Sequence, residues 1–337
     1  MPVRRLLPAL LAVVLCCAVP PAAGAAPYLP APGQTWNGVT AGDSIDAFTA
    51  EVGRPAVWQH FIQWNGAFDA AIDESKAAGT RLMLALGTSF GQDLPERFSP
   101  GELARGFGDE FLVALAERLA AEGRPVYLRL MGEMNNCHNP YAPTSCLGTP
   151  RDFDHSAVVF RQAWRRAWVI MRGGEGDAID ARLRRLGLPP LQVDGAVFPR
   201  AQVAFVWAPM TGGSPNIASL RPSVFWPGSR YVDWVGTSFY SRFPNFVGLS
   251  AYYRAFAVGL RKPFALAEWA MWGADDPRFV RRLFAWIAAR PRVRMLQYNQ
   301  GDLPDSPFRL DRYPAAMAAM RRALASPRFT APPPETG

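Results

Sequence analysis

Two glutamates of this chain follow apolar segments that are typical of buried strands. Glu133 stands in YLRLMGEMNN (127–136), and Glu268 stands in ALAEWAMW (265–272). Two carboxyl groups about 5 to 5.5 Å apart suit retaining glycoside hydrolysis, in which one attacks the anomeric carbon while the other protonates the departing oxygen and then activates water. The pair therefore predicts glycoside hydrolysis, a chemistry that needs neither a metal nor a cofactor. A third acid, Asp43, follows the first predicted strand and stands where a helix would begin. A catalytic role and a helix-capping role are equal alternatives for it.

The segments around these acids predict the fold that must position them. Eight runs of apolar, β-branched or aromatic residues recur, and most are continuous, as in a parallel sheet covered on both faces. Segments with helical spacing lie between them. This alternation predicts an α/β fold, the (β/α)8 TIM barrel, with a doubly wound open sheet as the alternative. The predicted strands are 36–41, 56–64, 81–87, 125–131, 202–208, 232–240, 263–269 and 293–299.

Three segments carry apolar stripes at helical spacing, and two others break the pattern. The segment 101–123 predicts one helix that ends at Gly123, and the segment 275–290 predicts a helix capped by Asp275 or Asp276. The catalytic groups of a barrel lie at the C-terminal ends of its strands, so the acids after the fourth and seventh strands can share one cleft. The helical segments are 101–123, 156–171 and 275–290; residues 173–200 read as an insertion, and 214–231 are too proline-rich for a helix.

Aromatic and amide residues gather near the predicted strand ends. Sugar rings present apolar C–H faces that stack on aromatic side chains, while amides bond hydroxyl groups. Each aromatic alone is more often core, because large aromatics dominate packing, but their grouping with two acids favours a sugar site. The candidates for substrate binding are Arg129, Asn135, Asn136, Trp64, Trp207, Tyr240, Trp269, Trp272, Gln297 and Tyr298.

Other chemistries find little support in the sequence. The three histidines, His60, His138 and His155, lack metal-ligand spacing, and no nucleophile elbow, phosphate-binding loop or dinucleotide fingerprint occurs. The formal net charge of +8 comes from scattered arginines with no basic block. We therefore expect no cofactor, no metal and no nucleic acid partner.

The ends of the chain predict export. Residues 1–25 have the charged, apolar and small-residue order of a signal peptide, with a retained anchor as the alternative. Residues 26–326 would then form one secreted catalytic domain, a monomer that leaves the membrane after cleavage, and residues 327–337 a disordered tail. Cys137 and Cys146 remain after cleavage, and in an oxidising compartment their spacing favours a disulfide over two free thiols.

Several segments together resemble glycoside hydrolase family 26, retaining (β/α)8 enzymes of clan A best known as β-mannanases. The likeness covers most of the mature chain. By this resemblance Glu133 takes the acid/base role and Glu268 the nucleophile's, Arg129 keeps the nucleophile ionised, and Tyr240 orients it. The segments are 38–64, YLRLMGEMN (127–135), VDWVGTSFY (232–240), FALAEWAM (264–271) and FRLDRYPAAMAAMRRAL (308–324).

One position departs from the family pattern. The family usually has histidine directly before the acid/base glutamate and glycine after the asparagine, whereas this chain has Gly132 and Asn136. By the resemblance, the change would remove a polar contact to the substrate, and the loop CHNPYAPTSC (137–146) could reshape the cleft instead.

Three functions follow from these observations. The first is a secreted endo-acting hydrolase of a β-linked polysaccharide. Its first candidate substrate is β-1,4-mannan, followed by mixed-linkage glucan or xylan. The second is a catalytically weakened barrel that binds carbohydrate, which the missing histidine favours. The third is a structural or adhesive protein in which both glutamates are merely buried and paired, with Arg129 as one partner.

Overall fold

The computed structural model describes residues 28–42, 44–89, 95–301, 303 and 305–329. The predicted signal peptide and Asp43 lie outside these residues, as do residues 330–337 of the expected tail. Within the described part of the chain, no helix combines the length and the apolar character needed to cross a bilayer.

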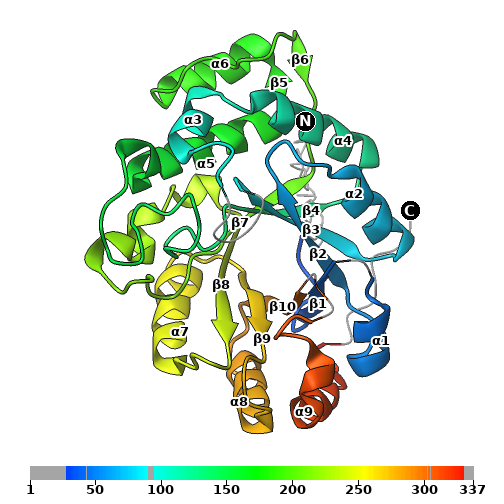
Figure 1. The fold of residues 1–337 in the computed structure, drawn as a ribbon. Helices are drawn as coiled ribbons and strands as arrows, with labels where there is room; N and C mark the ends of the chain where they lie inside the picture. Colours follow the sequence, from blue (N-terminus) through cyan, green and yellow to red (C-terminus); the bar gives the residue numbers. More distant parts are fainter. Residues whose placement is uncertain (1–27, 43, 90–94, 302, 304, 330–337) are drawn as a thin grey trace, which may run out of the picture.

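Eight parallel strands close into a barrel at the centre of the molecule (Figure 1). The hydrogen-bonded order is β1-β10-β9-β8-β7-β4-β3-β2, so each strand neighbours the next one of the barrel along the chain. This arrangement confirms the predicted TIM barrel, and every strand begins and ends within two residues of its expected position. The strands are β1 (Trp36–Ala41), β2 (Val57–Gln63), β3 (Arg81–Gly87), β4 (Val126–Leu130), β7 (Val203–Trp207), β8 (Trp234–Tyr240), β9 (Phe264–Ala270) and β10 (Val293–Gly301).

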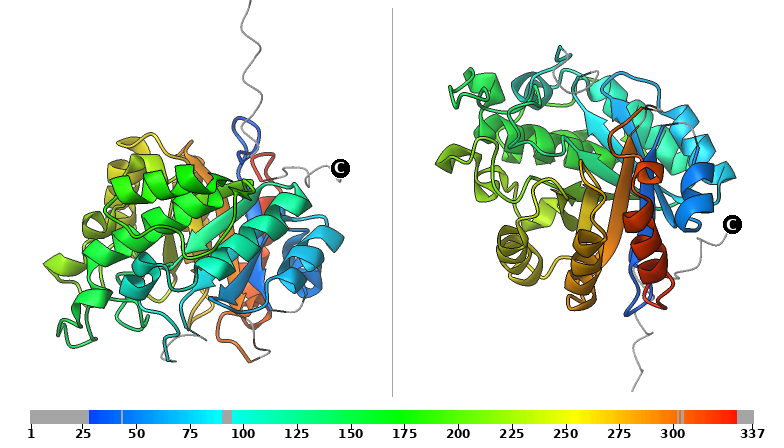
Figure 2. Two further views of the ribbon diagram at one scale, coloured as in Figure 1. Left: turned by 90° about the horizontal axis from the view of Figure 1, so that it is seen from above. Right: turned by 60° about the horizontal axis from the view of Figure 1, so that its bottom comes forward.

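Helices surround the barrel on its outer face, as the two views of Figure 2 also show. The continuous apolar strands are thereby covered on both sides, which explains their lack of alternation. The last helix packs beside the first and completes the ring. The surrounding helices are α1 (Asp46–Val52), α2 (Asp69–Ala77), α3 (Pro100–Arg105), α4 (Asp109–Glu122), α5 (Ala157–Met171), α7 (Phe246–Tyr252) with the π-helical turn Tyr253–Val258, α8 (Pro277–Ala288) and α9 (Pro314–Leu324).

The barrel interior is filled by side chains from its own strands. Tyr127 of β4 packs edge-on against Trp36 and Trp234, with ring centroids 5.9 and 5.6 Å apart. Val57 and Met83 belong to the same buried cluster. A larger apolar cluster lies between the strands and the helices. The barrel is therefore a solid support, and chemistry is confined to its ends.

The prediction of one helix over residues 101–123 is wrong. The structure has two helices, α3 and α4, separated at Gly106 and Gly108, whose φ angles are +105° and +91°. A left-handed backbone at both positions ends the first helix and redirects the chain. Phe107, expected in the apolar stripe, is 54% exposed. The predicted stop at Gly123 is confirmed by its left-handed C-cap geometry.

The other helix predictions are confirmed. In α5 the stripe residues Phe160, Trp164 and Met171 are fully buried, and the fourth, Trp168, is partly buried against the same core. Asp276 caps α8, because its side chain accepts a hydrogen bond from the backbone N–H of Arg278 at 2.8 Å.

The expected insertion and the proline-rich segment also appear in the structure. Residues 173–200 contain α6 (Gly176–Arg185) and the antiparallel pair β5 (Gly174–Glu175) and β6 (Val197–Phe198), at the edge of the molecule in Figure 1. Residues 214–231 hold only short 3-10 turns.

Part of the expected disordered tail is packed against the barrel. The guanidinium of Arg328 donates to the carbonyl oxygens of Ala288 and Arg290, both at 2.9 Å, and Phe329 is buried beside Phe284.

Candidate active site

Both glutamates lie at the C-terminal rim of the barrel. Glu268 is the fifth residue of β9, and Glu133 follows the end of β4 at Leu130 by three residues. Because all eight strands are parallel, these ends open on the same face. The side chain of Arg129, on β4, forms an ion pair with Glu268, and its charge also acts on Glu133.

Glu268 is 6% exposed and held by two donors. The Nη1 of Arg129 donates to its Oε1, and the hydroxyl of Tyr240, at the end of β8, donates to its Oε2 at 2.7 Å. Asn299 in turn donates from Nδ2 to the Tyr240 hydroxyl at 3.1 Å. Burial, and then the charges of Glu268 and Glu133, raise the pKa of Tyr240 well above its ordinary value, so it stays a donor. The carboxylate is therefore fixed in one orientation.

Glu133 lies on a strained turn. Its φ is +53°, and that of Met131 is +42°, in the left-handed region that residues other than glycine rarely adopt. The backbone N–H of Glu133 donates to the carbonyl of Ala208 at 2.8 Å, and Asn139 Nδ2 donates to the Glu133 carbonyl at 2.9 Å. Such strain persists only where the surroundings enforce it, and it concentrates at functional sites.

The environment of the Glu133 carboxyl raises its pKa above the ordinary value. Burial is the largest cause and the nearby charge of Glu268 the second. The charge of Arg129 and hydrogen bonds from Ser238 and Asn136 oppose the shift without cancelling it. The bond from Asn136 Nδ2 to Glu133 Oε2 is 2.9 Å long. Two nearby carboxyls thus sit in different environments, the arrangement that separates an acid from a nucleophile.

Gly132 is required by the position of Arg129. A Cβ built on Gly132 would lie 2.6 Å from Nε, 2.7 Å from Cζ and 2.8 Å from Nη2 of Arg129. These separations are far inside van der Waals contact, so the guanidinium occupies the space that a side chain would need. The departure from the family histidine is therefore matched to the placement of the arginine.

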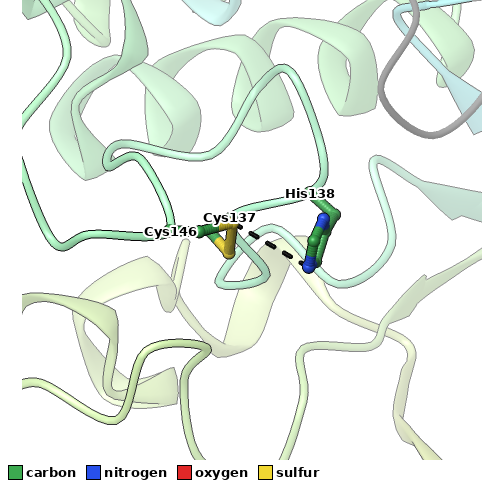
Figure 3. A group of neighbouring side chains, drawn as sticks. All are labelled: Cys137, His138 and Cys146. Carbon is green, nitrogen blue, oxygen red and sulfur yellow. Dashed lines mark hydrogen bonds between the residues drawn. A yellow bond between two sulfur atoms is a disulfide. The ribbon is translucent and has the colours of Figure 1, made fainter.

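Cys137 and Cys146 are joined by a disulfide, with Cα atoms 4.9 Å apart. The closed loop supports Glu133, because Tyr141 within it donates to the Gly132 carbonyl at 2.6 Å. Figure 3 shows His138 beside the disulfide, with Nε2 3.8 Å from Cys146 Sγ. These three residues are the one cluster of three potential metal ligands in the described chain. Sulfurs bonded to each other lack the thiolate charge that a metal binds, so the two cysteines serve as a structural crosslink that closes the loop.

Asn135, expected to bind substrate, has a packing role instead. It is fully buried, and its Nδ2 donates to the carbonyls of Met210 and Leu220 at 3.1 and 3.0 Å. Its Oδ1 accepts from the backbone N–H of Met210 at 2.8 Å. The amide therefore joins the β4 and β7 loops, and its complete burial keeps it from a sugar hydroxyl.

Three aromatics of the predicted sugar site belong to the core. Trp207, Trp269 and Tyr298 are each 0% exposed, so no sugar ring can stack on them in this structure. Trp269 packs edge-on against Tyr298 at 4.9 Å. Ordinary packing, the alternative that their type alone favoured, is what the structure shows. Trp64 and Gln297 are buried as well.

Trp272 and Tyr240 remain at the rim. Their rings meet edge-on at 5.9 Å, and Trp272 lines a cavity of about 670 Å³. Ser241 and Arg242, which were not among the predicted site residues, line the same cavity. Their position directly after the sixth predicted strand was the signal that could have identified them.

No family model matches the chain, and no curated protein matches it. Solved structures do resemble it. The YdhT protein from Bacillus subtilis has 16% identity and a TM-score of 0.55, with 90% of this chain and 88% of that chain covered. Bacillus subtilis mannanase man26 has 15% identity and a TM-score of 0.55 over the same shares. The GH26 β-mannanase BoMan26A from Bacteroides ovatus has 13% identity and a TM-score of 0.53, covering 88% of this chain and 90% of that one.

The chain shares their fold. Most of the similar structures are mannanases of glycoside hydrolase family 26, the family that the sequence segments resemble. At identities of 13 to 16% the comparison is one of architecture, so the chemistry must be argued from the site itself.

Proposed function

We propose that the protein is a secreted retaining glycoside hydrolase that cleaves a β-linked polysaccharide, with β-1,4-mannan the first candidate backbone. The observation that carries the proposal is the group around Arg129, in which Glu268 is held by two donors while Glu133 has a raised pKa. The family 26 mannanases among the similar structures supply the substrate class. Export rests on the signal-type segment at residues 1–25.

The two environments assign the roles in a double displacement. Glu268, oriented by Arg129 and Tyr240, attacks the anomeric carbon and forms the glycosyl-enzyme. Glu133 keeps its proton to a higher pH than an exposed glutamate, and gives it to the departing oxygen. It then takes a proton from the water that releases the sugar.

The test separates the two glutamates by substrate. Glu268→Ala should abolish release of an aryl glycoside, and azide should restore part of it by taking the carboxylate's place. Glu133→Ala should lose polysaccharide hydrolysis yet keep much of its glycosylation step on an aryl glycoside, whose leaving group needs no proton. Glu117→Ala, an exposed glutamate on α4, serves as the control. Full turnover by Glu268→Ala would remove that residue from the mechanism.

A second candidate is a carbohydrate-binding protein on the same barrel. Gly132, in the place of the family histidine, is the observation that favours it. Reducing-sugar release from mannan, glucomannan, lichenan and xylan, compared with retardation on gels that contain the same polymers, separates the two. Retardation without release would select binding.

A further inference from the structure

A second feature of the rim is a cavity of about 670 Å³, within the range of about 300 to 1,000 Å³ typical of small-molecule sites. Three loops form it, those that follow β8, β9 and β10. Its lining residues are Ser241, Arg242, Trp272, Gly273, Ala274, Asp276, Pro307, Arg312 and Tyr313.

The cavity begins one side chain away from Glu268. Tyr240 donates to Glu268 at 2.7 Å, and the other edge of its ring contacts Trp272 and Phe308, with centroids 5.9 and 5.3 Å away. Ser241 and Arg242 continue the chain directly from Tyr240. A polysaccharide cleaved at Glu268 would therefore place one of its neighbouring units against this cavity.

The cavity carries cationic and aromatic groups together. The Cζ of Arg242 lies 4.9 Å from the centroid of the Trp272 ring and 5.8 Å from that of Phe243, which is 63% exposed. Arg312 stands on the opposite loop and donates only to the carbonyl of Asp305, at 3.3 Å, among the contacts of the described residues. No carboxylate pairs with either guanidinium in the described part of the chain.

One acid also lines the cavity. Asp276 is committed to the start of α8, where its Oδ1 accepts the backbone N–H of Arg278 at 2.8 Å. The lining thus holds two unpaired guanidinium groups against one carboxylate that already caps a helix. The excess of basic over acidic side chains in the chain adds an attractive field for an anionic polymer.

We propose that this cavity is a subsite for a sugar unit that carries a carboxylate, so that the natural polysaccharide contains a uronic acid. This inference rests on the proposed function, because it names the substrate class of the same cleft. Trp272 supplies apolar surface in the lining for the sugar's C–H groups, and the planar guanidinium groups of Arg242 and Arg312 match a carboxylate.

Binding is measured first, on the catalytically blocked Glu268→Gln protein. The probes are glucuronoxylan and glucuronomannan, each beside its carboxyl-reduced form, which differs only in the charge. Affinity gels should show stronger retardation by the acidic polymer. The added double substitution Arg242→Gln and Arg312→Gln should weaken that binding by about five-fold, the upper range for exposed ion pairs, and leave the reduced polymer unaffected.

A matched control separates the site from general charge attraction. Arg185→Gln removes an exposed arginine on α6, at the far edge of the molecule in Figure 1, and should leave binding unchanged. Equal retardation by the acidic and reduced polymers would overturn the proposal. An equal loss with Arg185→Gln would overturn it too, because the attraction would then be non-specific.

Hydrolysis by the wild-type protein tests the acidic-sugar subsite separately from the proposed hydrolase activity. Cleavage of the reduced polymer as fast as the acidic one, with no effect of the two arginine substitutions, would leave the hydrolase standing and refute the subsite. Arginine-dependent binding without cleavage of any polymer would refute the hydrolase and keep the subsite. Cleavage that favours the acidic polymer and depends on both arginines supports the two together.

Discussion

Gly132→Ala is the substitution that tests the site most directly. The added Cβ would lie 2.6 to 2.8 Å from three atoms of the Arg129 guanidinium. Ordinary carbon–heteroatom contact begins near 3.4 Å, so the guanidinium must withdraw by about 0.8 Å. Arg129 Nη2 is already 3.4 Å from the Ser238 hydroxyl, at the limit of a hydrogen bond. The shift therefore weakens the contacts that Arg129 makes with Ser238 and Glu268.

The expected loss in rate follows from that displacement. A misplacement of about 1 Å in catalytic geometry can cost about 100-fold in rate, and overpacking a filled interior costs about 1 to 3 kcal/mol of stability. We expect kcat/KM on an aryl glycoside to fall by about 100-fold, mainly in kcat. The melting temperature should drop by a few degrees.

The assay compares Gly132→Ala with Gly212→Ala. Gly212 lies on the neighbouring β7 loop, and a Cβ there would meet nothing closer than Asn216 Oδ1 at 3.9 Å. The control should keep wild-type kinetics and melting temperature. If Gly132→Ala behaved in the same way as Gly212→Ala, the close packing of Arg129 on Gly132 would have no part in holding Glu268.

Three further predictions concern residues around the two glutamates. Asn135→Ala should cost about 1 to 3 kcal/mol, because buried carbonyls lose their donor, and should lower the melting temperature with KM unchanged. Glu133 has a raised folded pKa, so its contribution to stability is complete below about pH 4.3 and is lost as pH rises through the folded value. The melting temperature of Glu133→Gln should therefore exceed that of wild type at pH 7 but not near pH 4. The same melting temperature for variant and wild type at pH 7 would contradict the pKa shift. Replacing Cys137 and Cys146 by serine, which opens a loop with a sequence separation of 9, should cost about 2.5 kcal/mol and lower kcat more than it raises KM. An unchanged melting temperature would show that the disulfide does not contribute to the stability of the protein.

The barrel could be predicted because its strands are covered on both faces. Continuous apolar runs such as those of β3 and β9 can be recognised in the sequence without knowledge of how the helices pack around them. The break between α3 and α4 was missed because the apolar spacing continues through Gly106 and Gly108. Only the backbone angles at these glycines show that the chain turns there.

The candidate site could be predicted where residue type and strand end coincide. Arg129 and Tyr240 contact Glu268 as the resemblance implied, while the catalytic roles of Glu133 and Glu268 stay predictions. The aromatics were less predictable, since a tryptophan at a strand end can face the cleft or the helices. Trp269 directly follows Glu268, so the alternation of a strand turns it to the opposite face.

The loops around the cavity are fastened to one another before any sugar arrives. Ser241 accepts a hydrogen bond from the backbone N–H of Trp272 at 2.8 Å, and the hydroxyl of Tyr313 accepts from that of Gly273 at 3.2 Å. Tyr313 also donates to the carbonyl of Pro307 at 2.5 Å. Little chain has to be ordered when a ligand enters, so affinity is not lost to loop entropy. Crystals grown without ligand should accept a soaked oligosaccharide and keep their lattice.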